Sequence, residues 1–303
     1  MEVDVPDGVS RDGFLDLLGR LDGSRTIEDL ERETGLDGEV VREVVEPAVG
    51  WGLIDEGAVP VVSPGTAALA RLEGLLNDLL EDLVLTGPFW RRILERPQRL
   101  HPNVFFGFGL ENWFLLSRES GLGSAVQTLA ENADLRQALD DFDRRGSRHD
   151  DVAVRAFRSL GATRGDLLRA RPLPTTAALI KMLSWWARTD PLFFVATLGV
   201  IEERLEADNE EPVARCPFLA ACETVGLTPG FVEPMRAHAR AGAARRHGAL
   251  SRALFARMPG IDEETERSWQ AKAHLFMETY AGFCDGVLDH YSDPHRPLLR
   301  LCG

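Results

Sequence analysis

The chain has 303 residues, of which 44% are hydrophobic and 27% are charged, and its formal net charge is −14. This length and composition are typical of a soluble globular protein with one large domain or two smaller ones. Because nucleic-acid binding depends on clustered cations, the negative charge argues against a general nucleic-acid binder.

The sequence carries no signal for export or membrane insertion. Its first residues lack a basic segment followed by an apolar run, so we expect no signal peptide. The longest apolar stretch, residues 192–201, is about half the length that a membrane-spanning helix needs. The four cysteines match no compact zinc motif and are expected to be reduced thiols; they are Cys216, Cys222, Cys284 and Cys302. We expect a cytoplasmic protein with no membrane partner.

The first 62 residues predict a small domain of their own. Residues 13–21 are apolar at helical spacing, Thr26 is a suitable N-cap for a second helix, and Gly35 is a suitable stop for it. Asp37 can cap a third helix with valines on its apolar side. Residues 53–57 and 59–62 then read as a strand, a turn and a strand. Three helices followed by a β-wing are the element order of a winged-helix domain.

The segments LLGRLDGSRTIEDLERETGL and GLIDEG resemble the peptide-recognition domains of the pyrroloquinoline-quinone chaperone type, over residues 1–62. Such domains accompany enzymes that modify ribosomal peptides, so the resemblance implies that a ribosomal precursor peptide or a carrier-bound peptide is the partner. Docking by strand addition at the wing edge would suit this fold. A DNA-binding winged helix needs a basic recognition helix, but residues 37–49 hold one Arg against four acidic residues. Peptide docking and a purely structural role stay open.

The rest of the chain predicts a mostly α-helical domain over residues 68–295, after a linker at Ser63-Pro64-Gly65. We expect Gly107 and Gly109 to break a helix and Cys216 to lie in a connector. No strands alternate with helices and no repeat has a fixed period, which excludes doubly wound folds and solenoids. A bundle of about seven helices is the expected fold. The predicted helices are 67–85, 88–95, 110–117, 124–143, 149–161, 175–188, 192–208, 229–258 and 262–291.

Four polar residues stand on apolar faces of separate predicted helices: Glu111, His149, Glu202 and His238. Two carboxylates and two imidazoles are the donors that an iron or manganese site in a bundle core requires. Each residue alone also has a simpler explanation, because a buried Glu often pairs with an Arg and a core His is often only hydrogen-bonded.

The stretches HDDVAVRAFRSLG and RPLPTTAALIKMLSWWARTDPLFFVATLGVIE resemble the haem-oxygenase-like dimetal oxidases, a family of iron-containing redox enzymes related to thiaminase-like and pyrroloquinoline-quinone-synthase-like proteins. The resemblance covers residues 68–295. It implies a seven-helix haem-oxygenase-like bundle that binds metal with Glu and His and uses dioxygen as a co-substrate. The implied metal ligands are Glu111, His149, Glu202 and His238. Proteins of this fold class often pair, so a homodimer is a further expectation.

The sequence departs from the family pattern in its final metal-binding motif, His-x-x-x-Asp-x-x-His. After His238, Gly242 stands in place of the Asp and Arg245 in place of the second His. The carboxylate expected seven residues before His149 falls on Phe142, between two aspartates. The resemblance therefore implies one iron position and a degraded second one.

Three functional hypotheses follow. In the first, iron held by the four ligands activates dioxygen to oxidise a peptide or an amino-acid-derived substrate in natural-product biosynthesis, and Arg245 holds a substrate carboxylate. In the second, the domain works without metal, and His149, His238 and Arg245 move protons and bind anions. In the third, the domain is catalytically inactive and serves as a peptide-binding partner in a biosynthetic complex.

Overall fold

The computed structural model describes residues 9–21, 25–50, 62–118, 149–205, 216–243, 248–258 and 260–301. The chain divides into two compact units, Met1–Val61 and Val62–Gly303, and each is considered by itself. Within the described residues, no helix combines the length and apolar character needed to cross a membrane.

The first unit contains three helices, α1 (Arg11–Gly19), α2 (Ile27–Thr34) and α3 (Gly38–Gly50). Thr26 caps α2 in a capping box with Asp29, and Gly35 ends the helix with a φ of 69°, which glycine adopts without steric cost. A small apolar core joins the helices through Phe14, Leu17, Leu30, Val41 and Val44. Residues 51–61, where the wing is predicted, lie outside the described residues.

The expected boundary between the domains needs a correction at Val62. Val62–Ser63 forms strand β1, which pairs antiparallel with β2 (Ile261–Asp262) inside the second unit. Gly65 does not continue a linker but begins helix α4, where an added Cβ would lie 2.3 Å from the Phe255 carbonyl oxygen. This close approach to a distant segment is why glycine stands there, and the local sequence gives no sign of it.

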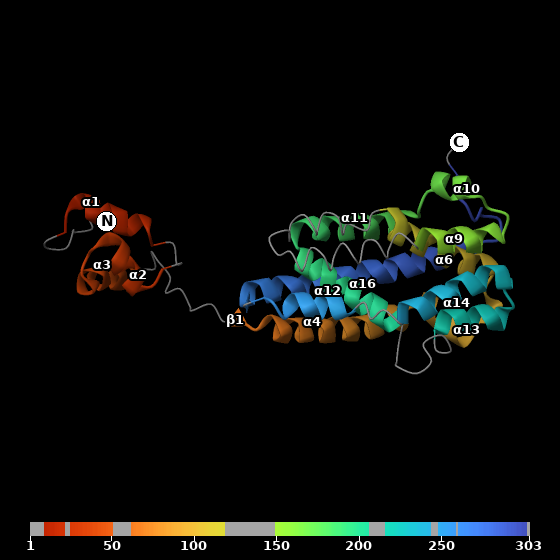
Figure 1. Cartoon of the computed structure of the whole chain (residues 1–303), viewed down its shortest axis with the longest axis horizontal. Helices are drawn as coiled ribbons and strands as arrows, with labels where there is room; N and C mark the ends of the chain where they lie inside the picture. The colour runs from red at the N-terminus through yellow and green to blue at the C-terminus, as the bar shows by residue number, and fades with distance from the viewer. Residues whose placement is uncertain are drawn as a thin grey trace. The chain divides into compact units, whose positions relative to one another are not determined.

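The second unit is a bundle of helices (Figure 1). Its described helices, in chain order, are α4 (Gly65–Leu79), the π-helical η1 (Leu80–Leu85), α5 (Pro88–Glu95), the 3₁₀ turn η2 (Pro97–Arg99), α6 (Pro102–Arg118), α9 (His149–Arg158), α10 (Arg164–Arg169), α11 (Pro174–Thr189), α12 (Pro191–Leu205), α13 (Pro217–Val225), α14 (Pro229–Ala243), α15 (Gly248–Phe255) and α16 (Glu263–Tyr291).

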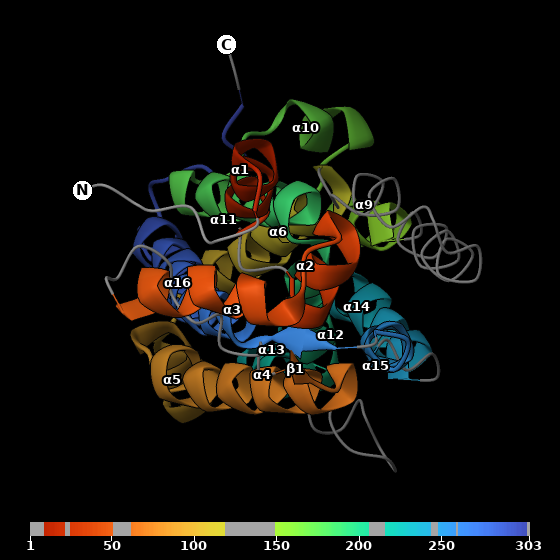
Figure 2. The same cartoon turned by 90° about the vertical axis from the view of Figure 1, so that its left-hand side faces the viewer.

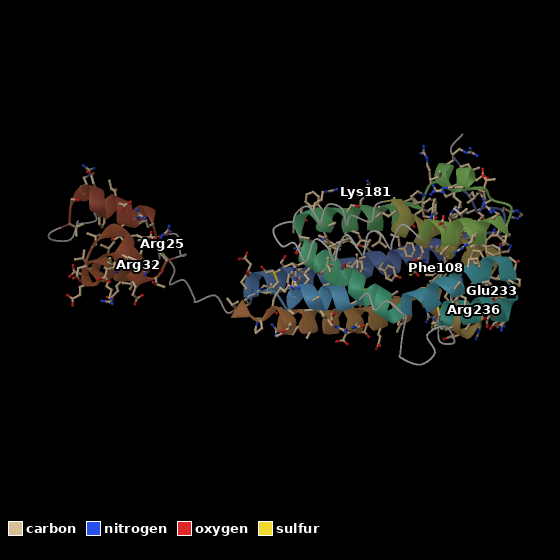
Figure 3. All side chains as sticks on the ribbon, viewed as in Figure 1. Arg25, Arg32, Phe108, Lys181, Glu233 and Arg236 are labelled. Atoms are coloured by element: carbon tan, nitrogen blue, oxygen red, sulfur yellow. The ribbon has the colours of Figure 1, made fainter. Side chains whose placement is uncertain are left out.

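Helix α16 is the centre of this bundle and runs along its length (Figure 1). It packs against α4, η1, α5, α6 and α11. Asp262 caps its N-terminus by accepting a hydrogen bond from the Thr265 amide. Aromatic side chains fill the space beside it, among them Phe108, which is labelled in Figure 3. The Phe108 ring stacks on Phe89 with ring centroids 4.9 Å apart, and its centroid lies 6.1 Å from that of Phe283. Burial of such rings dominates core stabilisation.

The structure corrects the sequence-based expectation at two glycines and adds one helix that the sequence reading missed. Gly107 and Gly109 do not break a helix but lie within α6, which begins at Pro102. An added Cβ at Gly107 would lie 2.2 Å from the Tyr291 ring, so glycine lets two helices approach closely. Cys216 lies outside the helices as expected, as the N-cap residue of α13, but the segment expected as a connector contains this helix, Pro217–Val225. The predicted helix 124–143 lies outside the described residues.

Candidate functional site

Glu111 is the one predicted ligand whose side chain the structure describes, and it is fully buried. The Tyr291 hydroxyl donates a 2.8 Å hydrogen bond to its Oε1 atom. The Leu173 backbone amide donates a 3.0 Å hydrogen bond to its Oε2 atom. Both carboxylate oxygens are therefore engaged by donors from α16 and from the residue that caps α11.

Burial raises the pKa of the Glu111 carboxyl, because the apolar core disfavours its charged form. The neighbouring Thr176 hydroxyl, the hydrogen bonds from Leu173 and Tyr291, and the positive charge of Arg300 act in the opposite direction. Burial also raises the pKa of the Tyr291 hydroxyl, and the Glu111 charge adds to that shift. Desolvation outweighs the favourable partners, so the folded protein holds the Glu111 proton to a higher pH than an exposed glutamate would.

Local sequence explains how these partners come together. Pro174 begins α11 at the position where its missing amide costs nothing. The amide of Leu173, the N-cap residue before it, has no acceptor within the helix and donates to Glu111. The chain end returns to the same place: the Arg171 amide donates to the Arg300 carbonyl oxygen at 3.0 Å. The Arg300 guanidinium in turn donates to the Pro172 carbonyl oxygen at 2.6 Å. The C-terminal segment thus supplies Arg300, a cation whose charge lowers the pKa of the buried carboxyl.

Glu111 faces away from helix α14, on which His238 stands. Gly107 and Glu111 are one helical turn apart on α6, and both meet Tyr291 of α16. Gly109 meets Phe231 and Met235 of α14 instead. Two residues along a helix correspond to a rotation of about 200°. The carboxylate of Glu111 and helix α14 are therefore on opposite sides of α6.

The packing of α9 against α14 sets positions 149 and 238 at a similar level along the two helices. Helices α9 and α14 pack against each other, with the Phe157 and Phe231 rings 5.6 Å apart and Ser159 against Gly230. From this contact, position 149 lies eight residues back along α9 and position 238 lies seven residues forward along α14. These contacts show that the helices run antiparallel. Going back along α9 and forward along α14 therefore moves in the same direction, by about 11–12 Å in each case. Positions 149 and 238 are thus at one level of neighbouring helices.

The remaining predicted site residues are placed less completely. Glu202 lies in the last turn of α12, which forms an antiparallel pair with α11 through the Trp186–Phe193 contact at 4.9 Å. The side chains of His149, Glu202 and His238 are not among those that the structure describes, and Arg245 lies outside the described residues altogether. Across the described part of the chain, no three His, Cys, Asp or Glu side chains gather in a way that could hold a metal ion.

Sequence reasoning identified Glu111 as buried but missed its partners. Tyr291 is 180 residues away along the chain, and the Leu173 donor is a backbone amide with no side-chain signature. A signal for Tyr291 existed in its position: it ends an apolar stripe on the last helix that includes Tyr280 and Val287. That stripe predicts burial, and a buried tyrosine hydroxyl needs a partner.

Comparisons with known proteins identify the fold of the chain but not its activity. No family model matches the chain, and no curated protein matches it. Among solved structures, it is similar to a domain of unknown function with a heme oxygenase-like fold from Shewanella denitrificans OS217. That match has a TM-score of 0.56 at 19% sequence identity and covers 75% of this chain and 92% of the other. The helical unit therefore has a heme oxygenase-like fold.

Proposed function

We propose that the helical unit is an iron-dependent oxidase that uses dioxygen, and that the N-terminal unit holds its peptide or peptide-derived substrate. The observation that carries the proposal is the register of α9 and α14. It sets the positions of two histidines, His149 and His238, at one level on neighbouring helices. Position 149 also continues the buried α9 stripe of Ala156, and position 238 continues the α14 stripe of Phe231.

The donor set fits a mononuclear iron site once Glu111 is left out of it. His149, His238 and Glu202 are two imidazoles and one carboxylate, which is the donor set of non-haem iron oxygenases with open coordination positions. Iron bound by these residues would supply the activation of dioxygen. Glu111 has a different role in this proposal, because turning it to a metal would leave the Leu173 amide and the Tyr291 hydroxyl buried without an acceptor.

The charge of the N-terminal unit supports a cationic peptide as its partner. Residues 1–61 contain 16 acidic and 5 basic residues, a net charge of −11 out of −14 for the whole chain. On α3, Glu39, Glu43 and Glu46 recur at helical spacing and are all exposed. A surface of this kind attracts basic segments and repels acidic ones.

Metal content tests the oxidase proposal. The full chain is loaded anaerobically with ferrous iron, desalted and assayed by plasma mass spectrometry. We expect about one iron per chain, the stoichiometry of a mononuclear site with this donor set. The variants His149→Ala and His238→Ala should lose the iron and keep their helical circular dichroism. His274→Ala is the matched control, because His274 is an exposed histidine on α16, and it should bind iron like the wild type.

Two outcomes would contradict this assignment in different ways. If the wild-type chain binds no iron, the oxidase proposal fails, and the metal-free or inactive peptide-binding protein takes its place. If Glu111→Gln loses iron while remaining folded, Glu111 is a ligand after all and the donor set is wrong.

Peptide binding tests the role of the N-terminal unit separately. A labelled peptide of alternating Lys and Leu is titrated with the full chain by fluorescence anisotropy, with an alternating Glu and Leu peptide as the control. We expect binding of the basic peptide alone, weakened by added salt because the attraction is electrostatic. The triple variant Glu39→Gln, Glu43→Gln, Glu46→Gln should weaken it about tenfold, from loss of three exposed charges. Equal binding of both peptides would overturn the charge argument.

A further inference from the structure

Seven arginines of the helical unit gather at one of its ends, outside the site described above. Residues 155–171, which include the last turn of α9 and the whole of α10, contain five arginines and one aspartate. Residues 293–301 contain two arginines and one aspartate. Together the two segments hold seven basic and two acidic residues, a net charge of +5 in a chain whose formal net charge is −14.

Backbone contacts join the two segments into one surface. The Arg171 amide donates a hydrogen bond to the Arg300 carbonyl oxygen at 3.0 Å, and Ala170 pairs with Leu301 in an antiparallel bridge. Helices α9 and α10 contact each other as well. Figures 1 and 2 both show α10 beside the segment that leads to the chain end marked C. We call the surface formed by residues 155–171 and 293–301 the basic end.

Neighbouring carboxylates pair with only some of the arginines of the basic end. Arg169 pairs with Asp166 at 2.7 Å, and Arg296 pairs with Asp293 at 3.6 Å. Three further arginines are exposed and form no ion pair within the part of the chain that the structure describes: Arg155, Arg158 and Arg164. Their charge is therefore open to an anionic partner.

The last acidic residues of α16 face another side of the helical unit. Asp285 accepts a hydrogen bond from the Phe89 amide of α5, and Asp289 follows it one turn later on the same side of α16. Figure 2 shows α5 and α10 on opposite sides of the unit. These two carboxylates therefore face away from the basic end.

Two large apolar side chains protrude among these arginines. Leu168 is 59% exposed and Leu301 is 50% exposed. Because Leu301 pairs with Ala170, two residues after Leu168, the Cα atoms of the two leucines are at most about 13 Å apart. Leu298 and Leu299 pack against the core and so hold the segment that carries Leu301. A single exposed leucine is ordinary, but two within a cluster of arginines form an amphipathic surface.

The charge of the helical unit is unevenly distributed along its length. Helix α16 ends at the basic end, but its first turn holds three acidic residues and lies about 43 Å away. Charges separated by more than about 8 Å are largely screened at physiological ionic strength. The local charge of the basic end, rather than the net charge of the chain, therefore decides what this surface attracts.

From this combination we propose that the basic end binds the surface of an anionic lipid bilayer. The arginines contact lipid phosphates, to which a guanidinium can donate two hydrogen bonds at once, and Leu168 and Leu301 enter the boundary between headgroups and acyl chains. A nucleic acid is also anionic, but no exposed Phe, Tyr or Trp stands on the basic end to stack on its bases. The expectation of no membrane partner rested on the lack of a spanning segment, which surface binding does not need.

Cosedimentation of the full chain with lipid vesicles tests the proposal. One set of vesicles contains phosphatidylserine in phosphatidylcholine, and the other contains phosphatidylcholine alone. We expect the partition coefficient to be at least about tenfold higher for the anionic vesicles, and to fall about tenfold when salt is raised from about 0.1 M to about 0.5 M, because the attraction is electrostatic. Equal partitioning into both kinds of vesicle, or no binding to the anionic ones, would overturn the proposal.

Paired variants locate the binding surface. Arg158→Gln with Arg164→Gln should lower the partition coefficient about 20-fold or more, since each basic residue near an anionic surface contributes about fivefold. Arg91→Gln with Arg92→Gln is the matched control, because it removes two exposed arginines of α5, and it should leave binding unchanged. Circular dichroism confirms that both double variants are folded. If the Arg158 and Arg164 variant binds like the wild type, the proposal fails.

The apolar contribution and the competing partner are tested in the same assay. Leu168→Ser should lower the partition coefficient about fivefold, whereas Leu94→Ser, at a position on α5 that is 53% exposed, should leave it unchanged. An unchanged coefficient for Leu168→Ser would contradict insertion of the leucines. If single-stranded RNA binds the wild type but not the Arg158 and Arg164 variant, while anionic vesicles do not sediment the chain, the basic end is a nucleic-acid surface instead and the proposal is wrong.

Discussion

The buried carboxylate of Glu111 makes a sharp prediction about how stability depends on pH. Glutamine at this position keeps the shape but carries no charge: its oxygen can accept from the Leu173 amide, and its NH2 group can donate to the Tyr291 hydroxyl oxygen. Burial raises the pKa of Glu111, so the folded chain holds this proton to a higher pH than the unfolded chain. As the pH rises above the ordinary Glu value of about 4.3, the unfolded state ionises first and the wild type loses stability.

The size of the effect follows from linkage. The free energy of unfolding of Glu111→Gln, relative to that of the wild type, should increase by up to about 1.4 kcal/mol for each pH unit between the Glu111 pKa of the unfolded chain and that of the folded chain. Above the folded pKa the difference should level off. Below the pKa of the unfolded chain, Glu111 is protonated in both the folded and the unfolded state. The wild type therefore loses no stability through Glu111 there.

Urea unfolding of both proteins from pH 4 to pH 8 measures the difference. Tryptophan fluorescence is a suitable probe, because five of the six tryptophans belong to the Val62–Gly303 unit. A difference in unfolding free energy that is constant over this range, or that moves in favour of the wild type as the pH rises, would refute the reasoning.

A double-mutant cycle isolates the hydrogen bond from Tyr291. Tyr291→Phe removes the donor to Glu111 and should cost about 1.5–3 kcal/mol at pH 8, the range for a hydrogen bond to a charged group. In the Glu111→Gln background the same change should cost about 1 kcal/mol, because the hydrogen bond there joins two neutral groups. Equal costs in both backgrounds would show that the carboxylate is not charged at that pH.

Three further changes test the packing of the helical unit by thermal or urea unfolding. Gly107→Ala should destabilise the helical unit by about 1–3 kcal/mol or more, because the new Cβ would lie 2.2 Å from the Tyr291 ring. Unchanged stability would mean that α6 and α16 can separate easily. Gly74→Ala should instead stabilise α4 by about 0.5–1 kcal/mol, because nothing lies within 4 Å of the added Cβ. A loss of stability would contradict the open surface at this position. Asp190→Ala should cost about 1–3 kcal/mol, because it leaves the Trp269 indole N–H without its 2.9 Å acceptor; unchanged unfolding would show that water replaces this contact.

The sequence by itself predicted most of what depends on local chemistry. Thr26, Gly35 and Asp262 stand where helices begin or end, because capping needs only a side chain and the backbone within a turn of it. The apolar spacing predicted a helical bundle without alternating strands, and the heme oxygenase-like fold of the solved neighbour agrees with it. The burial of Glu111 was also predictable, because its neighbours along the helix are apolar.

Only the tertiary structure decided what lies opposite these helices. Gly107 and Gly109 look like helix breakers in sequence, yet they continue α6 because Tyr291 and α14 come close to it there. The same folding turns Glu111 toward Tyr291 and the Leu173 amide, and away from α14. Helix periodicity predicts that a face is buried, but the element that buries it is chosen by contacts between residues far apart in the chain.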